Sequence, residues 1–338
     1  MILQRIKKRL QKKAVVLMYH RIATPATDPW LLCVSEAHFE QQLQVLRKHY
    51  KVIGVEELIE QHARRAVRSK SICITFDDGY RDNYLAAKPL LEKWGCPASF
   101  FLPTHFIGST KLFWWDELEQ IMLRQQQLPP LFNLTLQNQP FVFELTNETV
   151  LTPGLWSKHQ TWSAYDPPPT RRCELYYKVW EQLRPLPLAD IAARMDQIKD
   201  WASAIPSTGE TDLPFTTQHM QEMQAQPLFT IGLHTVTHPD LASHTVETQR
   251  RELVESIHYF KNHLGQQVRT LAYPYGRYNE ATLALARELD VQAAFTTFAE
   301  PVTNGADRHQ FGRFQVQNLN GKDFKLQLRR WSKTWLDW

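Results

Sequence analysis

Two short polar motifs combine residue types that can bind a metal ion and activate water. The motif TFDDG carries the adjacent carboxylates Asp77 and Asp78, and the motif HTVTH carries the imidazoles His234 and His238. Two neutral imidazoles and one carboxylate are a common ligand set for a hydrolytic zinc site with an open position. The other carboxylate then remains available as a base toward water. The two motifs therefore predict metal-dependent hydrolysis.

The polar groups of these motifs follow apolar runs that are typical of buried strands. Four such groups do so directly: His20 after residues 14–19, Asp77 and Asp78 after 71–76, His234 after 229–233, and Pro274-Tyr275 after 270–273. In parallel α/β folds, residues just beyond the carboxyl ends of the strands meet on one face, where active sites form. We therefore expect all four segments to converge on one site.

Strand-like and helix-like segments alternate along most of the chain. Strands are predicted at 14–19, 71–76, 98–102, 228–233, 270–273 and 293–297, and helices after Ser35 and at 55–65, 83–94, 217–224, 246–264 and 280–288. Repeated strand–helix units predict a mostly parallel sheet covered by helices, either open or closed into a barrel.

The interval from about 111 to 215 breaks this alternation. It is rich in proline, glutamine, tryptophan and tyrosine, and is predicted to be helical only around 115–124 and 172–201. Insertions of this kind often shape a substrate cleft, and a subdomain without that role is an almost equal alternative. We expect one domain over residues 14–338, with this insertion inside it.

Composition excludes several classes of function. The formal charge of +4 over 338 residues gives no global support for nucleic-acid binding, so no nucleic-acid partner is expected. The four cysteines are widely separated and require no disulfide framework. No secretory signal or membrane-spanning run is evident, so the expected location is cytoplasmic, including a peripheral position on the inner membrane face.

Residues 1–13 form a separate basic segment. It contains six lysines and arginines, and its apolar residues Ile2, Leu3, Ile6 and Leu10 share one helical face. Such a segment is compatible with peripheral contact to an anionic membrane. A solvated helix packed on the domain is the commoner alternative, because basic termini are frequent.

These motifs together resemble the polysaccharide deacetylases with NodB homology, carbohydrate esterase family 4. TFDDG at 75–79 and HTVTH at 234–238 match the first two family motifs, and YPYG at 273–276 is similar to the third. The segment VVLMYH at 15–20 is similar to the early histidine segment of a permuted branch. The resemblance covers roughly residues 14–110 and 216–300, and not the insertion.

The resemblance implies a fold and a role for each residue. The expected fold is α/β, a distorted (β/α)7-type barrel with a long, partly helical insertion. Asp77 is the implied general base, and Asp78, His234 and His238 are the implied ligands of a divalent metal, most plausibly Zn²⁺. The backbone N–H of Tyr275 is implied to hold the oxyanion, and His20 to be the catalytic acid.

One departure from the family pattern concerns the partner of the base. The third motif usually begins with an arginine that orients the base aspartate, but this chain has Ala272 there. Asp77 is therefore expected to lose a cation that keeps it ionised, with Arg277 as a candidate substitute. The usual late acid motif is also missing, which leaves His309 as the fallback for His20.

Three functions remain open on the sequence alone. The leading hypothesis is a metal-dependent deacetylase acting on an N-acetylhexosamine-containing glycan or glycolipid precursor. A glycan-binding pseudoenzyme is the second, motivated by Ala272. The third is an amidase on a small non-sugar amide, which the aromatic-rich insertion mildly disfavours because aromatic rings suit sugar stacking.

Overall fold

The structure, a computed structural model, describes residues 12–137 and 139–333 and divides into two compact units. Unit 1 comprises the described parts of Met1–Thr24, Cys33–Gly108 and Phe215–Trp338, and unit 2 comprises Pro25–Leu32 and Ser109–Pro214. Apart from Lys12 and Lys13, the predicted basic segment 1–13 lies outside the described residues.

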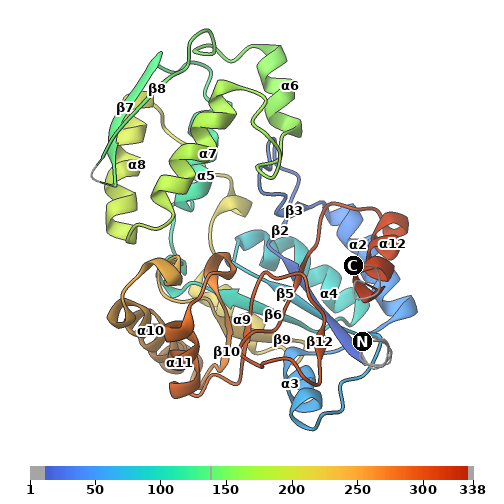
Figure 1. Cartoon of the computed structure of the whole chain (residues 1–338). Coiled ribbons are helices and arrows are strands. Elements are labelled where there is room, and N and C mark those ends of the chain that lie inside the picture. The colour runs from blue at the N-terminus through green and yellow to red at the C-terminus, as the bar shows by residue number, and fades with distance from the viewer. Residues whose placement is uncertain (1–11, 138, 334–338) are drawn as a thin grey trace, which may run out of the picture. The chain divides into compact units, whose positions relative to one another are not determined.

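Unit 1 is built around a curled, mostly parallel sheet (Figure 1). Its strands are β1 (Lys13–Tyr19), β4 (Lys51–Val52), β5 (Ser71–Phe76), β6 (Ala98–Leu102), β9 (Phe229–Leu233), β10 (Thr270–Ala272), β11 (Ala293–Phe295), β12 (Val302–Thr303) and β13 (Phe314–Gln315). The pair β2 (Arg21–Ile22) and β3 (Cys33–Val34) forms a separate small sheet. The strand order β11-β10-β9-β6-β5-β1 is parallel throughout.

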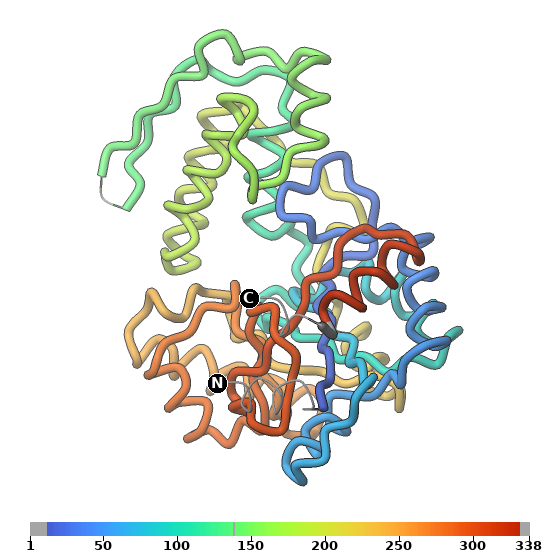
Figure 2. Tube along the Cα trace, turned by 45° about the vertical axis from the view of Figure 1, so that its right-hand side comes forward, coloured from blue at the N-terminus to red at the C-terminus, as the bar shows by residue number. Residues whose placement is uncertain are grey.

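The two edges of this sheet are joined by a short C-terminal segment. Phe311 forms a parallel bridge with Phe295 at the end of β11. Three residues later, Phe314 pairs in parallel with Leu17 of β1, and Figure 2 shows this late segment running beside the dark-blue β1. Residues 311–314 therefore curl the sheet toward closure, and the predicted distorted barrel is confirmed.

Helices cover the sheet because each presents one apolar face to it. Unit 1 contains α2 (Glu36–His49), α3 (Val55–Ala63), α4 (Lys88–Trp94), α9 (Thr217–Gln224), α10 (Val246–Leu264), α11 (Glu280–Glu288) and α12 (Gly321–Lys333). In α2 the Ser35 side chain caps the helix by accepting from His38 N, and Phe39, Leu43 and Leu46 are buried, as the periodicity predicts.

Unit 2 consists of helices and one hairpin. It contains α5 (Trp114–Glu119), α6 (Pro153–Thr161), α7 (Arg171–Leu183), α8 (Leu188–Ala202) and the antiparallel pair β7 (Leu131–Leu136) and β8 (Gln139–Glu144). The hairpin was not predicted. Residues 25–32 also belong to this unit, since Pro29 O accepts from Ala164 N at 2.7 Å and Trp30 Nε1 donates to the Tyr176 hydroxyl at 2.7 Å.

None of the helices that the structure describes has both the length and the apolar character of a membrane span. The four cysteines are buried and free, in agreement with the absence of a disulfide framework.

Candidate metal centre

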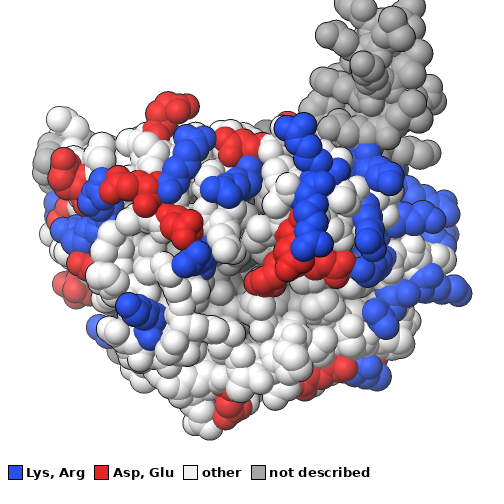
Figure 3. Space-filling model, turned by 90° about the horizontal axis from the view of Figure 1, so that it is seen from below, with Lys and Arg blue, Asp and Glu red and all other residues white. Residues whose placement is uncertain are grey.

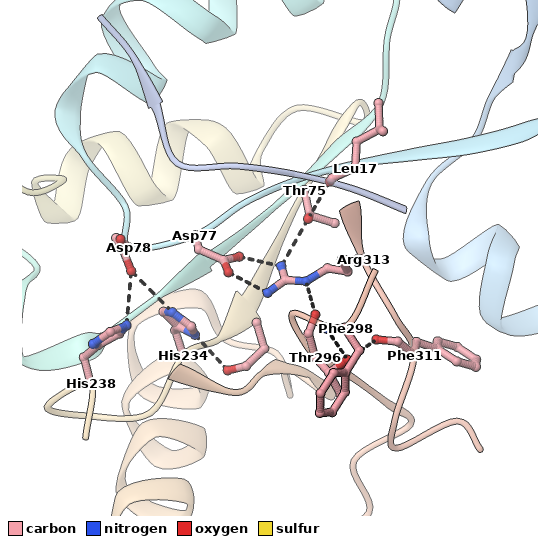
Figure 4. Close-up of polar contacts among 11 residues, drawn as sticks. Leu17, Thr75, Asp77, Asp78, His234, His238, Thr296, Phe298, Phe311 and Arg313 are labelled. Carbon is pink, nitrogen blue, oxygen red and sulfur yellow. Dashed lines mark hydrogen bonds and ion pairs between the residues drawn. The ribbon is translucent and has the colours of Figure 1, made fainter. Parts of the chain in front are cut away.

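Asp78, His234 and His238 meet at the carboxyl end of the sheet in unit 1 (Figure 4). Asp78 Oδ1 lies 3.4 Å from His234 Nε2 and 3.3 Å from His238 Nε2, and all three residues are buried. Ligands about 2.1 Å from one tetrahedral ion are separated by about 3.4 Å. The three atoms therefore have the spacing of a shared metal ion, and their nitrogen and oxygen chemistry suits one.

A hydrogen bond at the far side of the His234 ring supports this assignment. His234 Nδ1 lies 2.7 Å from the carbonyl oxygen of Ala272 at the end of β10. Because a carbonyl only accepts, Nδ1 carries the proton and the lone pair of Nε2 faces Asp78. A backbone carbonyl that fixes the tautomer in this way is the usual outer partner of a metal-ligating histidine.

The loop between the two histidines is held by a buried carboxylate on α10. Glu252 accepts from the backbone N–H groups of Val236 and Thr237, each at 2.8 Å, and from the Thr237 hydroxyl at 2.7 Å. Within the loop, His238 N donates to Thr235 Oγ1 at 3.1 Å. These bonds fix the two imidazoles relative to each other. Sequence reasoning missed Glu252, because nothing in α10 marks one glutamate among its charged residues.

The same place contains several residues with strained backbone. The non-glycine residues Asp78, Thr235, His238 and Tyr275 all have positive φ, between 57° and 69°. Such conformations cost about 1–3 kcal/mol each and persist where the surroundings enforce them, most often at functional sites. The next residue, Gly79, has φ +70°, and a Cβ there would come within 2.6 Å of Leu102, which explains the glycine of the TFDDG motif.

Asp77 is buried next to Asp78 but faces a different partner. Arg313 Nη1 and Nη2 donate to its two carboxylate oxygens at 2.7 and 2.6 Å. The guanidinium is fully buried and also donates to Thr75 Oγ1 at 3.2 Å and to the Thr296 carbonyl at 3.1 Å (Figure 4). Burial by itself would raise the pKa of Asp77, but the charge and hydrogen bonds of Arg313, together with the charges of His234 and His20, outweigh burial and hold that pKa below its ordinary value.

The expectation that Asp77 lacks a cationic partner is therefore wrong. Ala272 does leave the usual motif position without a cation, and Arg277 does not replace it, since its Nε pairs with Asp240 at 2.8 Å. The cation comes instead from Arg313. This residue lies between Phe311, which pairs with β11, and Phe314, which pairs with β1. One signal was available: Arg313 is a single charge in the otherwise apolar run FGRF.

His20 follows β1 at the same end of the sheet. Its carbonyl accepts from Asn83 Nδ2 at 2.8 Å, and the next residue, Arg21, is tied to the buried Asp82 by an ion pair of 2.9 Å. Its Nδ1 is buried and has no hydrogen-bond partner among the described residues. The pKa of Asp77 and the pKa of Asp78 are both lowered, chiefly by other neighbours that outweigh burial. The charge of His20 is a smaller cause in both cases, which indicates that His20 lies near both carboxylates.

Tyr275 also reaches the site. It lies in a single 3₁₀ turn, Pro274–Gly276, directly after β10, and its ring lies 4.6 Å from the His238 ring at 72°. The fallback His309 does not reach it. His309 Nε2 lies 2.9 Å from the carbonyl of Val291, just before β11, which is the opposite end of the sheet.

Comparisons with known proteins identify the family. The polysaccharide deacetylase family model matches residues 64–128 and 196–294. The putative polysaccharide deacetylase YxkH of Bacillus subtilis is 23% identical over 316 residues, which cover 92% of this chain and 74% of that protein. The poly-beta-1,6-N-acetyl-D-glucosamine N-deacetylase of Staphylococcus epidermidis is 22% identical over 334 residues, which cover 95% and 84%.

Solved structures agree on the fold. The Streptococcus pyogenes deacetylase PplD in complex with acetate has a TM-score of 0.58 and 20% identity, with 94% of this chain and 98% of that chain covered. IcaB from Ammonifex degensii has a TM-score of 0.57 and 19% identity, with 95% and 97% covered. With the family model, the two relatives and the shared fold in agreement, this chain belongs to the polysaccharide deacetylase family of hydrolases.

Proposed function

We propose that this protein is a metal-dependent deacetylase that removes acetyl groups from an N-acetylhexosamine-containing glycan or glycolipid precursor. The observation that carries the proposal is that the two adjacent carboxylates have different partners. The carboxylate of Asp78 lies beside two imidazole nitrogens, whereas the carboxylate of Asp77 forms an ion pair with Arg313. The substrate class is supported by the named activity of the Staphylococcus epidermidis relative.

Asp78, His234 and His238 would hold the metal, and zinc suits a set of two imidazole nitrogens and one carboxylate oxygen. When bound, zinc supplies a Lewis acid that polarises the amide carbonyl and makes water more acidic. The protein supplies the fixed geometry: the Ala272 carbonyl sets the His234 tautomer, and Glu252 holds the loop that carries both histidines.

Asp77 would act as the general base and accept the proton of the attacking water. For that role it must be ionised at neutral pH, and Arg313 favours the ionised form. The bidentate contact also fixes the direction of the carboxylate, because two parallel hydrogen bonds define its plane. Arg313 is therefore a positioning residue for the base.

Two further groups would complete the reaction. The backbone N–H of Tyr275 would donate to the tetrahedral oxyanion, a role supported by its position in a strained turn beside His238. His20 would protonate the departing amine, which is a poor leaving group without a proton. Its buried Nδ1, with no partner among the described residues, and its nearness to both aspartates support this role.

The test is acetate release from N-acetylglucosamine oligomers by the zinc-loaded protein. Asp77→Asn is expected to lower turnover by at least about 10³-fold while metal content stays at the wild-type level. Asp166→Asn, a matched change at an exposed aspartate of unit 2, is the control and is expected to leave turnover unchanged. Near-wild-type turnover by Asp77→Asn would exclude the base assignment.

Two other results would select another function. A wild-type protein that holds metal and binds these oligomers but releases no acetate would be a glycan-binding pseudoenzyme. Release of acid from small N-acyl amines without any release from the oligomers would indicate an amidase for non-sugar amides.

A further inference from the structure

The end of α2 and the helix α12 lie side by side in unit 1 (Figure 1). Both carry several basic residues. Burial lowers the pKa of His49, and so do the neighbouring charges of Lys325, Lys48, Arg329 and Lys70. One imidazole is therefore within electrostatic reach of four cations from three segments of the chain. We call these five residues the basic face.

Few acidic groups offset this charge. Lys48, Lys70 and Lys325 form no ion pair within residues 12–137 and 139–333. The sequence of α12 contains five lysines and arginines and only one acidic residue, Asp323. In Figure 3, Lys and Arg side chains gather toward the right-hand side, the side on which Figure 1 places α2 and α12. Like charges crowded in this way repel one another, so the face favours an anionic partner.

Among these cations, α12 also carries an exposed leucine, Leu326, that lies outside its buried face. Phe324 and Leu328 are buried, and Trp331 stacks on Phe314 at 4.9 Å, so the inward stripe of α12 is complete. Leu326 lies off that stripe and is 45% exposed. Its neighbours four residues before and after, on the same helical face, are Lys322 and Arg330. The outer face of α12 therefore alternates charge, leucine and charge.

The chain also enters the fold next to the basic face. β1 and β5 pair in parallel from Ala14 opposite Ser71, so Lys13 and Lys70 are neighbours at the start of the two strands. The sequence that precedes this point, residues 1–11, carries four more cations, Arg5, Lys7, Lys8 and Arg9. Within the described residues, Lys13 therefore adds a further cation beside Lys70 of the basic face.

We propose that the basic face binds the anionic surface of a lipid bilayer through its headgroups. The cations are spread over two helices and a loop, so several of them can contact different headgroups of one bilayer surface. Each basic residue near such a surface strengthens binding by about fivefold. The exposed Leu326 would enter the boundary between headgroups and acyl chains, as apolar residues of interfacial helices do. The proposal is independent of the deacetylase activity.

Sedimentation of the full-length protein with vesicles tests this proposal. The wild type is expected to bind vesicles of phosphatidylglycerol and phosphatidylcholine, not vesicles of phosphatidylcholine alone, and to be released by added salt. Lys48→Glu combined with Lys325→Glu is expected to weaken binding at least about twentyfold. The milder pair Lys48→Gln and Lys325→Gln covers the case in which charge reversal impairs folding, and is expected to weaken binding by about tenfold or more.

A matched control separates this face from net charge. Lys158→Glu with Lys261→Glu makes the same charge change at two exposed lysines elsewhere and is expected to bind vesicles like the wild type. Equal loss of binding in the control and test pairs would overturn the proposal. So would equal binding to both kinds of vesicle, or tighter binding to duplex DNA than to anionic vesicles. Acetate release from soluble oligomers, measured in parallel, is expected to be the same for all variants.

Discussion

The histidines at the two ends of the sheet in unit 1 differ in the partners of their Nε2 atoms. At the carboxyl end, the Nε2 atoms of His234 and His238 both face Asp78. At the other end, the Nε2 atoms of His62 and His309 lie 3.0 and 2.9 Å from backbone carbonyls. An imidazole engaged in that way ties loops together, whereas one that faces a buried carboxylate can bind a metal. The position of a histidine relative to the strand ends distinguishes these two roles better than its local sequence does.

The largest expected effect compares one histidine from each end. His234→Ala removes a proposed metal ligand, and should abolish metal binding and lower acetate release by at least about 10³-fold. His309→Ala should retain metal and turnover but lower the free energy of unfolding by about 1–3 kcal/mol, because it removes the hydrogen bond to the carbonyl of the buried Val291. Elemental analysis, acetate release and thermal unfolding distinguish these results. Loss of metal from His309→Ala would contradict the comparison.

The next expected effect concerns the buried ion pair at the carboxyl end. Arg313→Met leaves Asp77 buried and uncompensated, and should lower the free energy of unfolding by about 3–5 kcal/mol. Adding Asp77→Asn should restore much of that loss, since neither member of the pair is then charged. Denaturant unfolding of the two single variants and the double variant measures the coupling. Additive losses would mean that the pair is not coupled as its geometry implies.

His20→Ala tests a smaller contribution at the same end. It should slow turnover by about 10²-fold without changing metal content, because the change removes the proposed proton donor and none of the three proposed ligands. Loss of metal from this variant would make His20 a ligand and would revise the proposed mechanism.

The smallest expected effect concerns the loop support. Glu252→Gln keeps the size of the side chain but weakens its bonds to the backbone N–H groups of Val236 and Thr237, so metal affinity should fall by about tenfold. Glu255→Gln, an exposed position on the same helix, is the control. Calorimetric titration of the metal-free proteins measures the difference. Equal affinity in both variants would show that the loop holds its shape without Glu252.

Much of the fold was predictable because its signals are local. Apolar runs marked the parallel strands, and the residues just beyond them, Asp78, His234 and His238, do meet in space. Arg313 was not predictable in this way. It lies 236 residues from Asp77 in sequence, and no periodicity or spacing encodes a pair at that separation. The same holds for Trp30, whose loop packs in unit 2 although its neighbours in sequence belong to unit 1.

Segment 311–314, which joins the two edges of the sheet, has a consequence for the timing of folding. Because Arg313 lies in it, synthesis must proceed through residue 313 before the carboxylate of Asp77 gains its counter-charge. Until then, β1 and β5 can pair, but their polar end contains an unbalanced negative charge. We expect a growing chain to pair β1 with β5 before the proposed base Asp77 gains its counter-charge, so that chains ending before residue 313 lack hydrolytic activity.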